Sequence, residues 1–350
     1  MLSIWVNSET LPVRQSTGIF GQNIVWYNDD VSLNPMDVVL IGGDEFYYNI
    51  IESVAQYAWT FDNQRIIALG VVRKNDPAFL RPFFDELRAA GVTIVFVGAQ
   101  NLSKLWFDIY EQGESFFSPV IVDEKIDTSA NGPYGFINNH LYKCFQLNFI
   151  GTQVHLNHTP ASNDHYLLEN LRLGKLRSNK ELVEPAMRDS HFMVFNINAL
   201  KKSDAPAKSG VNPSGLNAEE ADQICRYAGL SEALTLFNIY GYSELEHETR
   251  QTSELVAQMM WYFLDGYSQR KQDYPLSEND LSGYVVDLSE PSTSLHFVKS
   301  KKSGRWWLKI PVDLNGITVD RMLPCTYHDY QMACEHELSE RIIQALERNV

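Results

Sequence analysis

The chain has 350 residues, enough for one large α/β domain or two ordinary ones, and its 44% hydrophobic content can supply a sizeable core. Its formal net charge of −15 argues against nucleic acid and anionic membranes as partners, because both favour a basic face. No apolar run approaches the ~20 residues of a membrane span, the N-terminus lacks a signal-peptide pattern, and the four cysteines form no C-x-x-C pair. We therefore expect an acidic cytoplasmic protein with reduced thiols.

The first half of the chain alternates apolar runs with amphipathic stretches. Strands are expected at 37–43, 65–72, 92–98 and 118–123. Helices are expected between them, at 47–59, 77–90 and 102–112, and the second of these has apolar residues at helical spacing before it stops at Gly91.

The second half continues the alternation and then loses it. Strands are expected at 191–198 and 234–242, and helices at 217–229 and 252–270. The stretch 201–213 is rich in Lys, Ser, Ala and Pro and is expected to be a loop. From 274 to about 320 the pattern indicates turns and short strands, and 341–348 is expected to be a short closing helix.

Fully apolar strands separated by helices are typical of a parallel sheet that is covered on both faces. We expect one domain over residues 1–350, with a core at about 37–270 and residues 271–350 as a C-terminal appendage packed on it. In such sheets the functional groups gather where the strands end. The aromatic residues Trp306, Trp307, Tyr327 and Tyr330 are expected to pack in a core or an interface.

Three short segments at expected strand ends carry the polar residues of interest. They contribute Gln100, then Asp123, Lys125 and Asp127, and finally Asn196 and Asn198. A divalent metal ion needs carboxylates or neutral imidazoles as ligands. In this set only two carboxylates stand beside an ammonium and three amides.

The order and spacing of these segments resemble the arginase, agmatinase and formimidoylglutamase family, the ureohydrolases, whose motifs are G-G-x-H-D, D-A-H-x-D, S-x-D-x-D-x-x-D-P and a late glutamate. The stretch 184–275 is most similar to the formimidoylglutamase branch. The resemblance implies a three-layer arginase/deacetylase-like α/β fold with a central, mostly parallel sheet and helices on both faces. In active members it also implies a Mn²⁺ pair that generates hydroxide to attack a guanidinium or amidine carbon.

The resemblance also implies a role for each position. Asp123 and Asp127 keep their aspartates, and Glu244 matches the late glutamate that contacts substrate in active members. The other four positions depart from the motif: Gln100 and Lys125 stand where histidines belong, and Asn196 and Asn198 stand where aspartates belong.

The charge balance of this set predicts that no binuclear metal centre forms and that the chain needs no cofactor. An ammonium beside a divalent ion costs several kcal/mol at close range. We expect Lys125 to occupy part of the vacated metal position, with Asp123 and Asp127 as counter-ions. Asparagine at 196 and 198 removes two further charges that lost their cations.

Three functions follow as hypotheses. The first is a catalytically inactive ureohydrolase-fold pseudoenzyme that binds a protein partner, a second copy of itself or a small ligand, with helix 252–270 and the aromatic C-terminal segment as candidate contact surfaces. The second is a metal-dependent hydrolase of formimidoylglutamate or a related guanidino or amidino compound. The third is a sensor of a guanidino or amino-acid ligand that Glu244 contacts. Glu244 is equally well explained as a buried hydrogen-bonding residue, and the histidines His155, His158 and His165 with Asp164 are more simply solvated than metal-bound.

Overall fold

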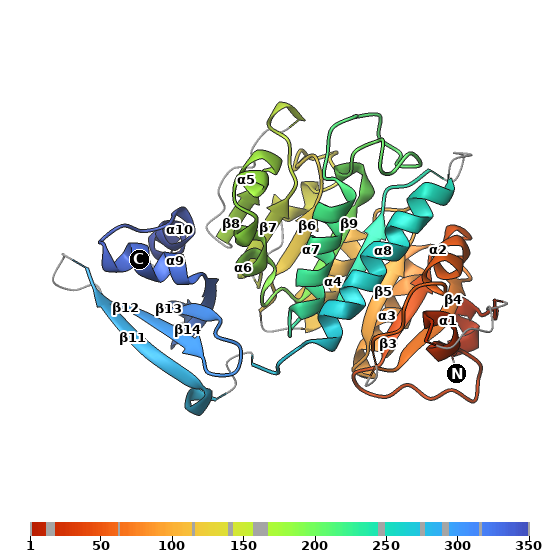
Figure 1. Ribbon diagram of the computed structural model, residues 1–350, viewed down its shortest axis with the longest axis horizontal. Coiled ribbons are helices and arrows are strands. Elements are labelled where there is room, and N and C mark those ends of the chain that lie inside the picture. Colours follow the sequence, from red (N-terminus) through yellow and green to blue (C-terminus); the bar gives the residue numbers. More distant parts are fainter. Residues whose placement is uncertain are drawn as a thin grey trace.

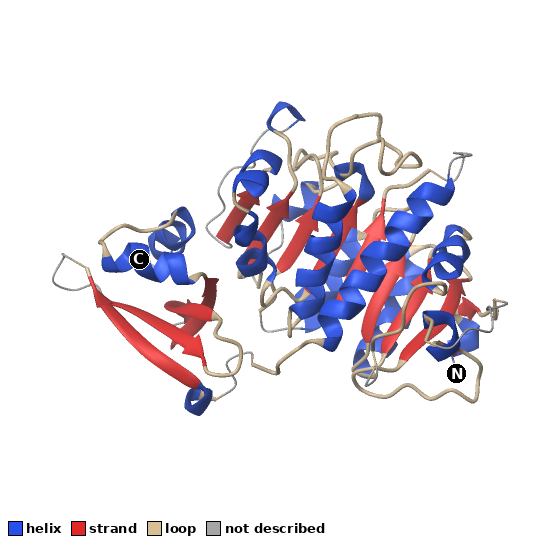
Figure 2. Cartoon of the chain, viewed as in Figure 1, coloured by secondary structure: helices blue, strands red, loops and turns tan. Residues whose placement is uncertain are grey.

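The main body of the protein is a large sheet with helices on both of its faces (Figures 1 and 2). The computed structural model describes residues 2–11, 18–61, 64–113, 116–138, 143–156, 167–243, 249–273, 277–288, 294–314 and 317–348. Within that part of the chain, no helix is long and apolar enough to cross a membrane.

The large sheet has ten strands among the described residues, and its strand order is β1-β4-β3-β5-β10-β9-β6-β7-β8, with β2 beside β4. Every pairing is parallel except that of β1 with β4. The strands are β1 Val6–Asn7, β2 Val25–Trp26, β3 Val38–Gly42, β4 Ile66–Val72, β5 Thr93–Val97, β6 Pro119–Val122, β7 Gln146–Ile150, β8 Leu167–Leu171, β9 Phe192–Asn196 and β10 Leu236–Tyr240.

The six strands that the sequence predicts are all present in this sheet as β3, β4, β5, β6, β9 and β10. The sequence did not predict β7 and β8, because neither is a plain apolar run. In β7 the buried residues include Gln146 and Asn148, and Asn148 Nδ2 donates to the Ala186 carbonyl at 2.5 Å. A polar side chain that has such a partner can lie inside a sheet without looking apolar in sequence.

Helices cover both faces, which confirms the predicted α/β class. The helices of the main body are α1 Phe20–Asn23, α2 Phe46–Val54, α3 Pro77–Ala89, α4 Ser103–Gly113, α5 Leu173–Ser178, α6 Val183–Met187, α7 Ala218–Leu230 and α8 Thr249–Ser268. Successive strand residues point to opposite faces. In β5, Val95 and Val97 belong to the core under α2, α7 and α8, whereas Ile94 and Phe96 belong to the core under α3 and α4.

Local sequence fixes several helix starts. Asp76 accepts hydrogen bonds from the main-chain N–H groups of Ala78 and Phe79 at the start of α3, where Pro77 is the first helical residue. Asn217 and Glu220 form a capping box at the start of α7. Each motif satisfies donors that the first helical turn leaves without partners.

Helix α8 corresponds to the segment that the sequence analysis offers as a candidate contact surface. Its apolar side is packed inside the molecule. The apolar residues that the sequence singles out on it are all buried, and they are Leu255, Val256, Met259, Met260, Phe263 and Leu264. Tyr262 on the same helix is 37% exposed, so only the outer side of α8 is available to a partner.

The C-terminal part forms a second sheet with its own core. Strands β11 Leu281–Asp287, β12 Ser294–Ser300, β13 Trp306–Leu314 and β14 Ile317–Cys325 pair antiparallel in that order. Helices α9 Tyr327–Cys334 and α10 Glu340–Arg348 pack on one face, around Phe297, Leu308 and Ile342. These strands have seven to nine residues, so the short strands expected here are wrong, whereas the closing helix is confirmed.

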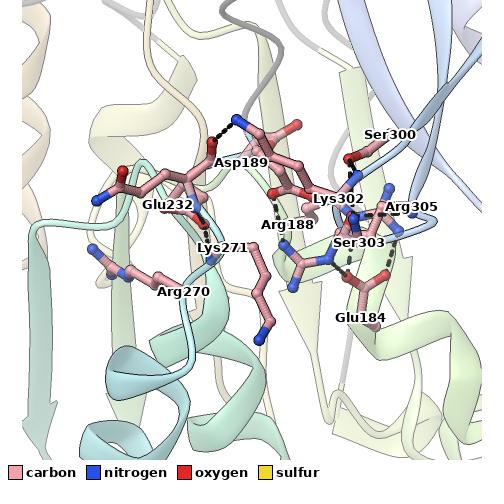
Figure 3. Close-up of polar contacts among 12 residues, drawn as sticks. Glu184, Arg188, Asp189, Glu232, Arg270, Lys271, Ser300, Lys302, Ser303 and Arg305 are labelled. Carbon is pink, nitrogen blue, oxygen red and sulfur yellow. Dashed lines mark hydrogen bonds and ion pairs between the residues drawn. The ribbon is translucent and has the colours of Figure 1, made fainter. Parts of the chain in front are cut away.

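Polar contacts join this C-terminal unit, defined here as residues 281–348, to the main body (Figure 3). Arg188, which follows α6, donates to the Trp306 carbonyl at 2.5 Å and to the Cys325 carbonyl at 3.3 Å. Trp307 Nε1 donates to Asp189 Oδ2 at 2.6 Å, and the Arg188 guanidinium lies 4.9 Å from the Trp307 ring centroid. The two tryptophans therefore serve two different contacts: Trp306 belongs to the C-terminal core and Trp307 to the interface.

Helices α7 and α8 pack backbone against backbone at two glycines. A Cβ added to Gly229 would lie 2.0 Å from the Phe263 carbonyl oxygen, and one added to Gly266 would lie 2.1 Å from the Arg226 carbonyl oxygen. Backbone atoms cannot move aside as the end of a side chain can, so both positions require glycine for this packing.

We expect Gly229→Ala to lower the free energy of unfolding by about 1–3 kcal/mol, because the added methyl group forces the two helices apart. Gly174→Ala is the matched control, since Gly174 is also helical and a Cβ there meets nothing within 4 Å. The control is expected to be neutral or stabilising by up to about 1 kcal/mol. Urea denaturation of both variants measures the difference, and equal effects would contradict the packing argument.

Candidate functional site

The candidate site lies at the carboxyl edge of the large sheet, where four neighbouring parallel strands end. The strands follow the order β5, β10, β9 and β6 across the sheet. Their ends bring Asp123, Asn196 and Tyr240 to one place, as the sequence predicts for strand-end residues.

Asp123 is the buried centre of this group. Its side chain is 4% exposed, and Oδ2 accepts hydrogen bonds from the Tyr134 hydroxyl at 2.6 Å and from Asn196 Nδ2 at 2.9 Å. Tyr134 and Tyr240 bring their hydroxyl oxygens within 3.0 Å of each other. Burial raises the pKa of Asp123 to about 6, and the hydrogen bonds from Tyr134 and Asn196 oppose part of that rise.

Asn196 links Asp123 to the loop after β9. Its Nδ2 group donates to Asp123 while its Oδ1 atom accepts from the main-chain N–H of Asn198 at 3.0 Å. An aspartate here has no hydrogen to donate at neutral pH and would add a second charge beside Asp123. Gly241 lies against the same side chain with φ +96°, and an added Cβ would come within 2.1 Å of Asn196 Oδ1.

Asn198 also serves the loop. Its Oδ1 atom accepts from the main-chain N–H of Gly210 at 2.7 Å, and its Nδ2 group donates to Ser209 Oγ at 3.0 Å. The two asparagines therefore hold the segment between β9 and α7 through neutral hydrogen bonds. These hydrogen bonds already use the Oδ1 atoms of Asn196 and Asn198, which are the atoms that would have to face a cation in order to bind it.

Lys125 does not take the position expected of it. Its ammonium pairs with Asp127 Oδ2 at 2.9 Å, and its side chain is 50% exposed. Only its main-chain N–H approaches Asp123, at 3.4 Å from Oδ1. Asp127 is thus confirmed as a counter-ion of Lys125, whereas Asp123 as a counter-ion is wrong, because the short connection from β6 directs Lys125 outward to solvent.

The Asp127 carboxylate is stabilised in its charged form. Oδ1 accepts from the Ser129 hydroxyl at 2.6 Å and from the Ser129 main-chain N–H at 3.2 Å. The hydrogen bond from the Ser129 side chain, with that from Lys125, lowers the pKa of Asp127 to about 2. Asp127 and Lys125 form a surface pair of their own, apart from the buried Asp123.

Lys208 supplies the buried cation of this region, and the sequence argument missed it. Its side chain is 0% exposed, and Nζ donates to the carbonyl oxygens of Asn198 at 2.9 Å and Leu200 at 2.5 Å. Glu124 Oε2 lies 3.9 Å from Nζ. Burial lowers the pKa of Lys208, and the nearby carboxylates of Glu124 and Asp123 oppose that shift.

The signal for Lys208 lay inside a segment that the sequence marks as a plain loop. The residues before it, Ala205 and Ala207, are buried together with it. A lysine between buried small residues is a better candidate for an internal ammonium than Lys125, which follows a strand end directly.

Two other predicted residues lie elsewhere, and four fall outside the described residues. Gln100 is exposed beyond the end of β5, and His155 is exposed after β7. Glu244 lies outside the described residues, as do His158, Asp164 and His165. One further residue at the described part of this edge is Asp44. Its carboxylate oxygens accept hydrogen bonds from the Tyr242 hydroxyl at 2.6 and 2.7 Å and from the Ala99 main-chain N–H at 2.9 Å.

The donor set does not suit a pair of divalent cations. Asp123 receives two donor hydrogens on one oxygen, Asn196 turns its amide N–H toward it, and Lys208 places an ammonium in the same region. Within the described residues, no group of three or more His, Cys, Asp or Glu side chains is arranged to hold a metal ion. The residues present form a network in which one buried carboxylate accepts hydrogen bonds from neutral donors.

Comparison with known proteins identifies the fold of this chain through solved structures of low sequence identity. No protein-family model and no curated protein matches the chain. Among solved structures, the formimidoylglutamase of Bacillus subtilis superposes with a TM-score of 0.62 at 12% identity, over 75% of this chain and 97% of its own. The Trypanosoma cruzi formiminoglutamase with Mn²⁺ superposes with a TM-score of 0.59 at 16% identity, over 67% and 94%. The chain has the formiminoglutamase fold.

Proclavaminate amidino hydrolase of Streptomyces clavuligerus extends the similarity, with a TM-score of 0.54 at 17% identity over 67% of this chain and 93% of its own. The three-layer fold implied by the sequence motifs is therefore confirmed. These superpositions leave between a quarter and a third of this chain without a counterpart in the three structures. Identities of 12–17% establish the fold alone, so the chemistry follows from this chain's own residues.

We expect Asp123→Asn to raise stability at pH 7–8, by about 1–3 kcal/mol. Because the pKa of Asp123 is raised on folding, its charged form opposes folding at neutral pH, and this cost disappears as pH falls from about 6 to about 4. An asparagine oxygen can still accept from Tyr134 and Asn196. The advantage of the variant over the wild type should therefore vanish near pH 4 in urea denaturation.

Asp127→Asn is the control with the opposite sign. The pKa of Asp127 is lowered to about 2, so its charge stabilises the folded state above about pH 4, and its removal should lower stability at pH 7. Loss of stability on Asp123→Asn at neutral pH would contradict the view that burial of the Asp123 charge opposes folding.

We expect Lys208→Met to lower the free energy of unfolding by about 3–5 kcal/mol, because it leaves two buried carbonyl groups and a nearby carboxylate without their ammonium. Lys104→Met is the control: Lys104 pairs with Asp108 on the surface of α4 with 64% of its side chain exposed. That change should alter stability by about 0.5 kcal/mol or less. Equal effects of the two substitutions would show that Lys208 has no such internal role.

Proposed function

We propose that this chain is a formiminoglutamase-fold protein that does not carry out metal-dependent hydrolysis, and that it acts by binding a protein partner or a small ligand. The observation that carries the proposal is the Asp123 network, in which the buried carboxylate is held by Tyr134 and Asn196 at 2.6 and 2.9 Å. In this setting the carboxylate is stabilised by hydrogen-bond donors and not by cations.

The charges around the site support the same proposal. Two-metal hydrolysis needs enough anionic ligands to balance two divalent ions and to hold a bridging hydroxide. Here one buried carboxylate has a pKa raised to about 6, and the loop after β9 carries the buried ammonium of Lys208, on which the charge of Asp123 acts. Placing divalent ions there would set them against a buried ammonium.

A hydrolase remains the second candidate, since the solved structures of this fold include a formimidoylglutamase and an amidino hydrolase. For this chain to share that chemistry, Asn196 and Asn198 would have to turn their oxygens to a metal ion and abandon their bonds to Asp123, Ser209 and Gly210. The sensor hypothesis depends on Glu244, which lies outside the described residues.

We expect the purified chain, dialysed against Mn²⁺, to retain well under one ion per molecule by mass spectrometry and to show no Mn²⁺-dependent rise in melting temperature. It should release no urea, formamide or ammonia from arginine, agmatine or formimidoylglutamate. The matched variant restores the family's ligand types at four positions through Gln100→His, Lys125→His, Asn196→Asp and Asn198→Asp. Its Mn²⁺ content should rise, because carboxylates and imidazoles replace amides and an ammonium.

The Trypanosoma cruzi formiminoglutamase, whose structure contains Mn²⁺, is the positive control for the metal assay. If the four-fold variant does not fold, the wild-type result still decides the question. Stoichiometric Mn²⁺ on the wild type, or turnover of any of the three compounds, would refute the proposal.

A further inference from the structure

Strand β11 forms one edge of the small sheet, and β12 is the only described strand that pairs with it. Figure 1 shows β11 along the outer side of the C-terminal unit. The strand has seven residues, and Gly283, Val285 and Asp287 in it are exposed. An edge strand carries a row of main-chain N–H and C=O groups that its own sheet leaves without partners.

The register with β12 shows which main-chain groups of β11 face outward. In an antiparallel pair, successive residues of one strand bond alternately toward the partner strand and away from it. The Lys301 N–H donates to the Asp280 carbonyl at 2.9 Å, so Asp280, just before β11, bonds toward β12. Every second residue after it does the same: Ser282, Tyr284 and Val286. The main-chain groups of the other four residues point to the open edge, namely those of Leu281, Gly283, Val285 and Asp287.

Strand β11 lacks the features that usually keep an edge strand from pairing. Exposed edges are commonly blocked by lysine, by proline, by a bulge or by a very short strand. The sequence of β11 is LSGYVVD, its register with β12 runs through all seven residues without a shift, and its one charged residue is Asp287 at the end. Val285, an apolar residue inside the strand, is 59% exposed. This edge is therefore suited to pairing with another strand.

The opposite edge strand of the same sheet differs from β11. Strand β14 contains a proline, Pro324, and two charged residues, Asp320 and Arg321. The Pro324 carbonyl accepts from Arg341 at 2.9 Å, and the Cys325 carbonyl accepts from Arg188 at 3.3 Å. The contrast between the two edges makes β11 the candidate contact surface of this unit.

Strand β11 is complementary to itself in one antiparallel register. A two-fold axis at Tyr284 places Gly283 opposite Val285 and Leu281 opposite Asp287, so each outward N–H meets an outward C=O of the other copy. No two charged residues of the strands face each other in this register. A Cβ at Gly283 would meet nothing within 4 Å, so the exposed valine of the other copy has space beside it.

The residue on the axis is aromatic. The Tyr284 ring packs on Trp306 and on Tyr330 of α9, with 4.8 and 5.5 Å between ring centroids. Its position in the sheet is thereby fixed on the side of α9. Two such rings facing each other across the axis would form an aromatic cross-strand pair, which stabilises antiparallel strands.

Charges at the two ends of the strand are also complementary. Asp287 at its end is exposed. At its start, Lys302 pairs with Asp280 at 3.0 Å, whereas Lys301 is exposed and donates to the Asn279 carbonyl at 2.8 Å. Antiparallel pairing brings the acidic end of one strand beside the end of the other copy that carries Lys301. This complementarity favours a second copy of the chain over an unrelated strand.

We propose that two copies of this chain associate through β11, whose strands pair antiparallel about a two-fold axis at Tyr284 and join the small sheets into one of eight strands, four from each copy. The contact uses the same surface on both copies, as two-fold dimers do. It is a short interface, so the association depends on concentration. The Asp123 network has no part in it, and the proposal therefore goes beyond the proposed function.

Sedimentation velocity of the full chain, from micromolar to submillimolar concentration, should show a species of twice the chain mass whose fraction rises with concentration. Val285→Pro and Val285→Lys should each raise the dissociation constant at least about tenfold, because the first removes an outward N–H and the second adds a charge at the edge. Both should keep the melting temperature of the wild type, since the Val285 N–H faces away from β12. Val211→Lys is the matched control, because Val211 is 91% exposed between β9 and α7, and its dissociation constant should be unchanged.

Cysteine variants test the register, in a Cys334→Ser background because Cys334 is the exposed thiol among the described cysteines. Under oxidising conditions Tyr284→Cys should form a disulfide between two copies, since residues that face each other across such an axis have Cα atoms about 4.5 Å apart. Ser282→Cys is the control on the same face of the strand. It should not cross-link, because Val286 of the other copy lies opposite it.

Three results would overturn the proposal: a chain that stays monomeric over the whole concentration range, dimers that neither Val285 variant weakens, or equal cross-linking through Ser282→Cys and Tyr284→Cys. A complex in which a different polypeptide pairs with β11, while the chain alone remains monomeric, would also overturn it.

Discussion

The hydrogen bonds on the Asp123 carboxylate are the interaction from which the character of this molecule follows. A buried carboxylate is costly unless a cation or several donors compensate it. Here the compensation comes from two neutral groups, the phenol of Tyr134 in the loop after β6 and the amide of Asn196 at the end of β9. Once these donors occupy the position, Asn196 has to keep its amide oriented toward Asp123, and the loop after β9 is held through Asn198.

The parallel sheet makes this arrangement possible. Strands β5, β10, β9 and β6 run in the same direction, so their carboxyl ends present side chains to one small region whatever those side chains are. The same fold can bring together either side chains that bind a metal ion or side chains that form only hydrogen bonds with each other. A shared fold therefore says little about chemistry, and the residues at the strand ends decide it.

Much of the fold could be predicted from the sequence because apolar runs and helical spacing report burial directly. The six predicted strands and the main helices are examples. Strand β7 was missed since Gln146 and Asn148 interrupt its apolar pattern, and their burial depends on contacts from distant segments. The site followed the same rule: the positions of Asp123 and Asn196 came from strand ends, but the direction of Lys125 and the burial of Lys208 depend on loop geometry that no local pattern encodes.

The contact made by Arg188 has a consequence for how this protein can change. Trp306 and Cys325 are partners in the register of β13 and β14, and Arg188 binds their carbonyl oxygens, which every amino acid possesses. Substitution of either side chain would disturb the core of the small sheet, in which both are buried, but would remove neither of the carbonyl groups that Arg188 binds. The joint at Arg188 therefore depends on the backbone of β13 and β14, and the side chains at these two positions are constrained by the core of the small sheet and not by the joint.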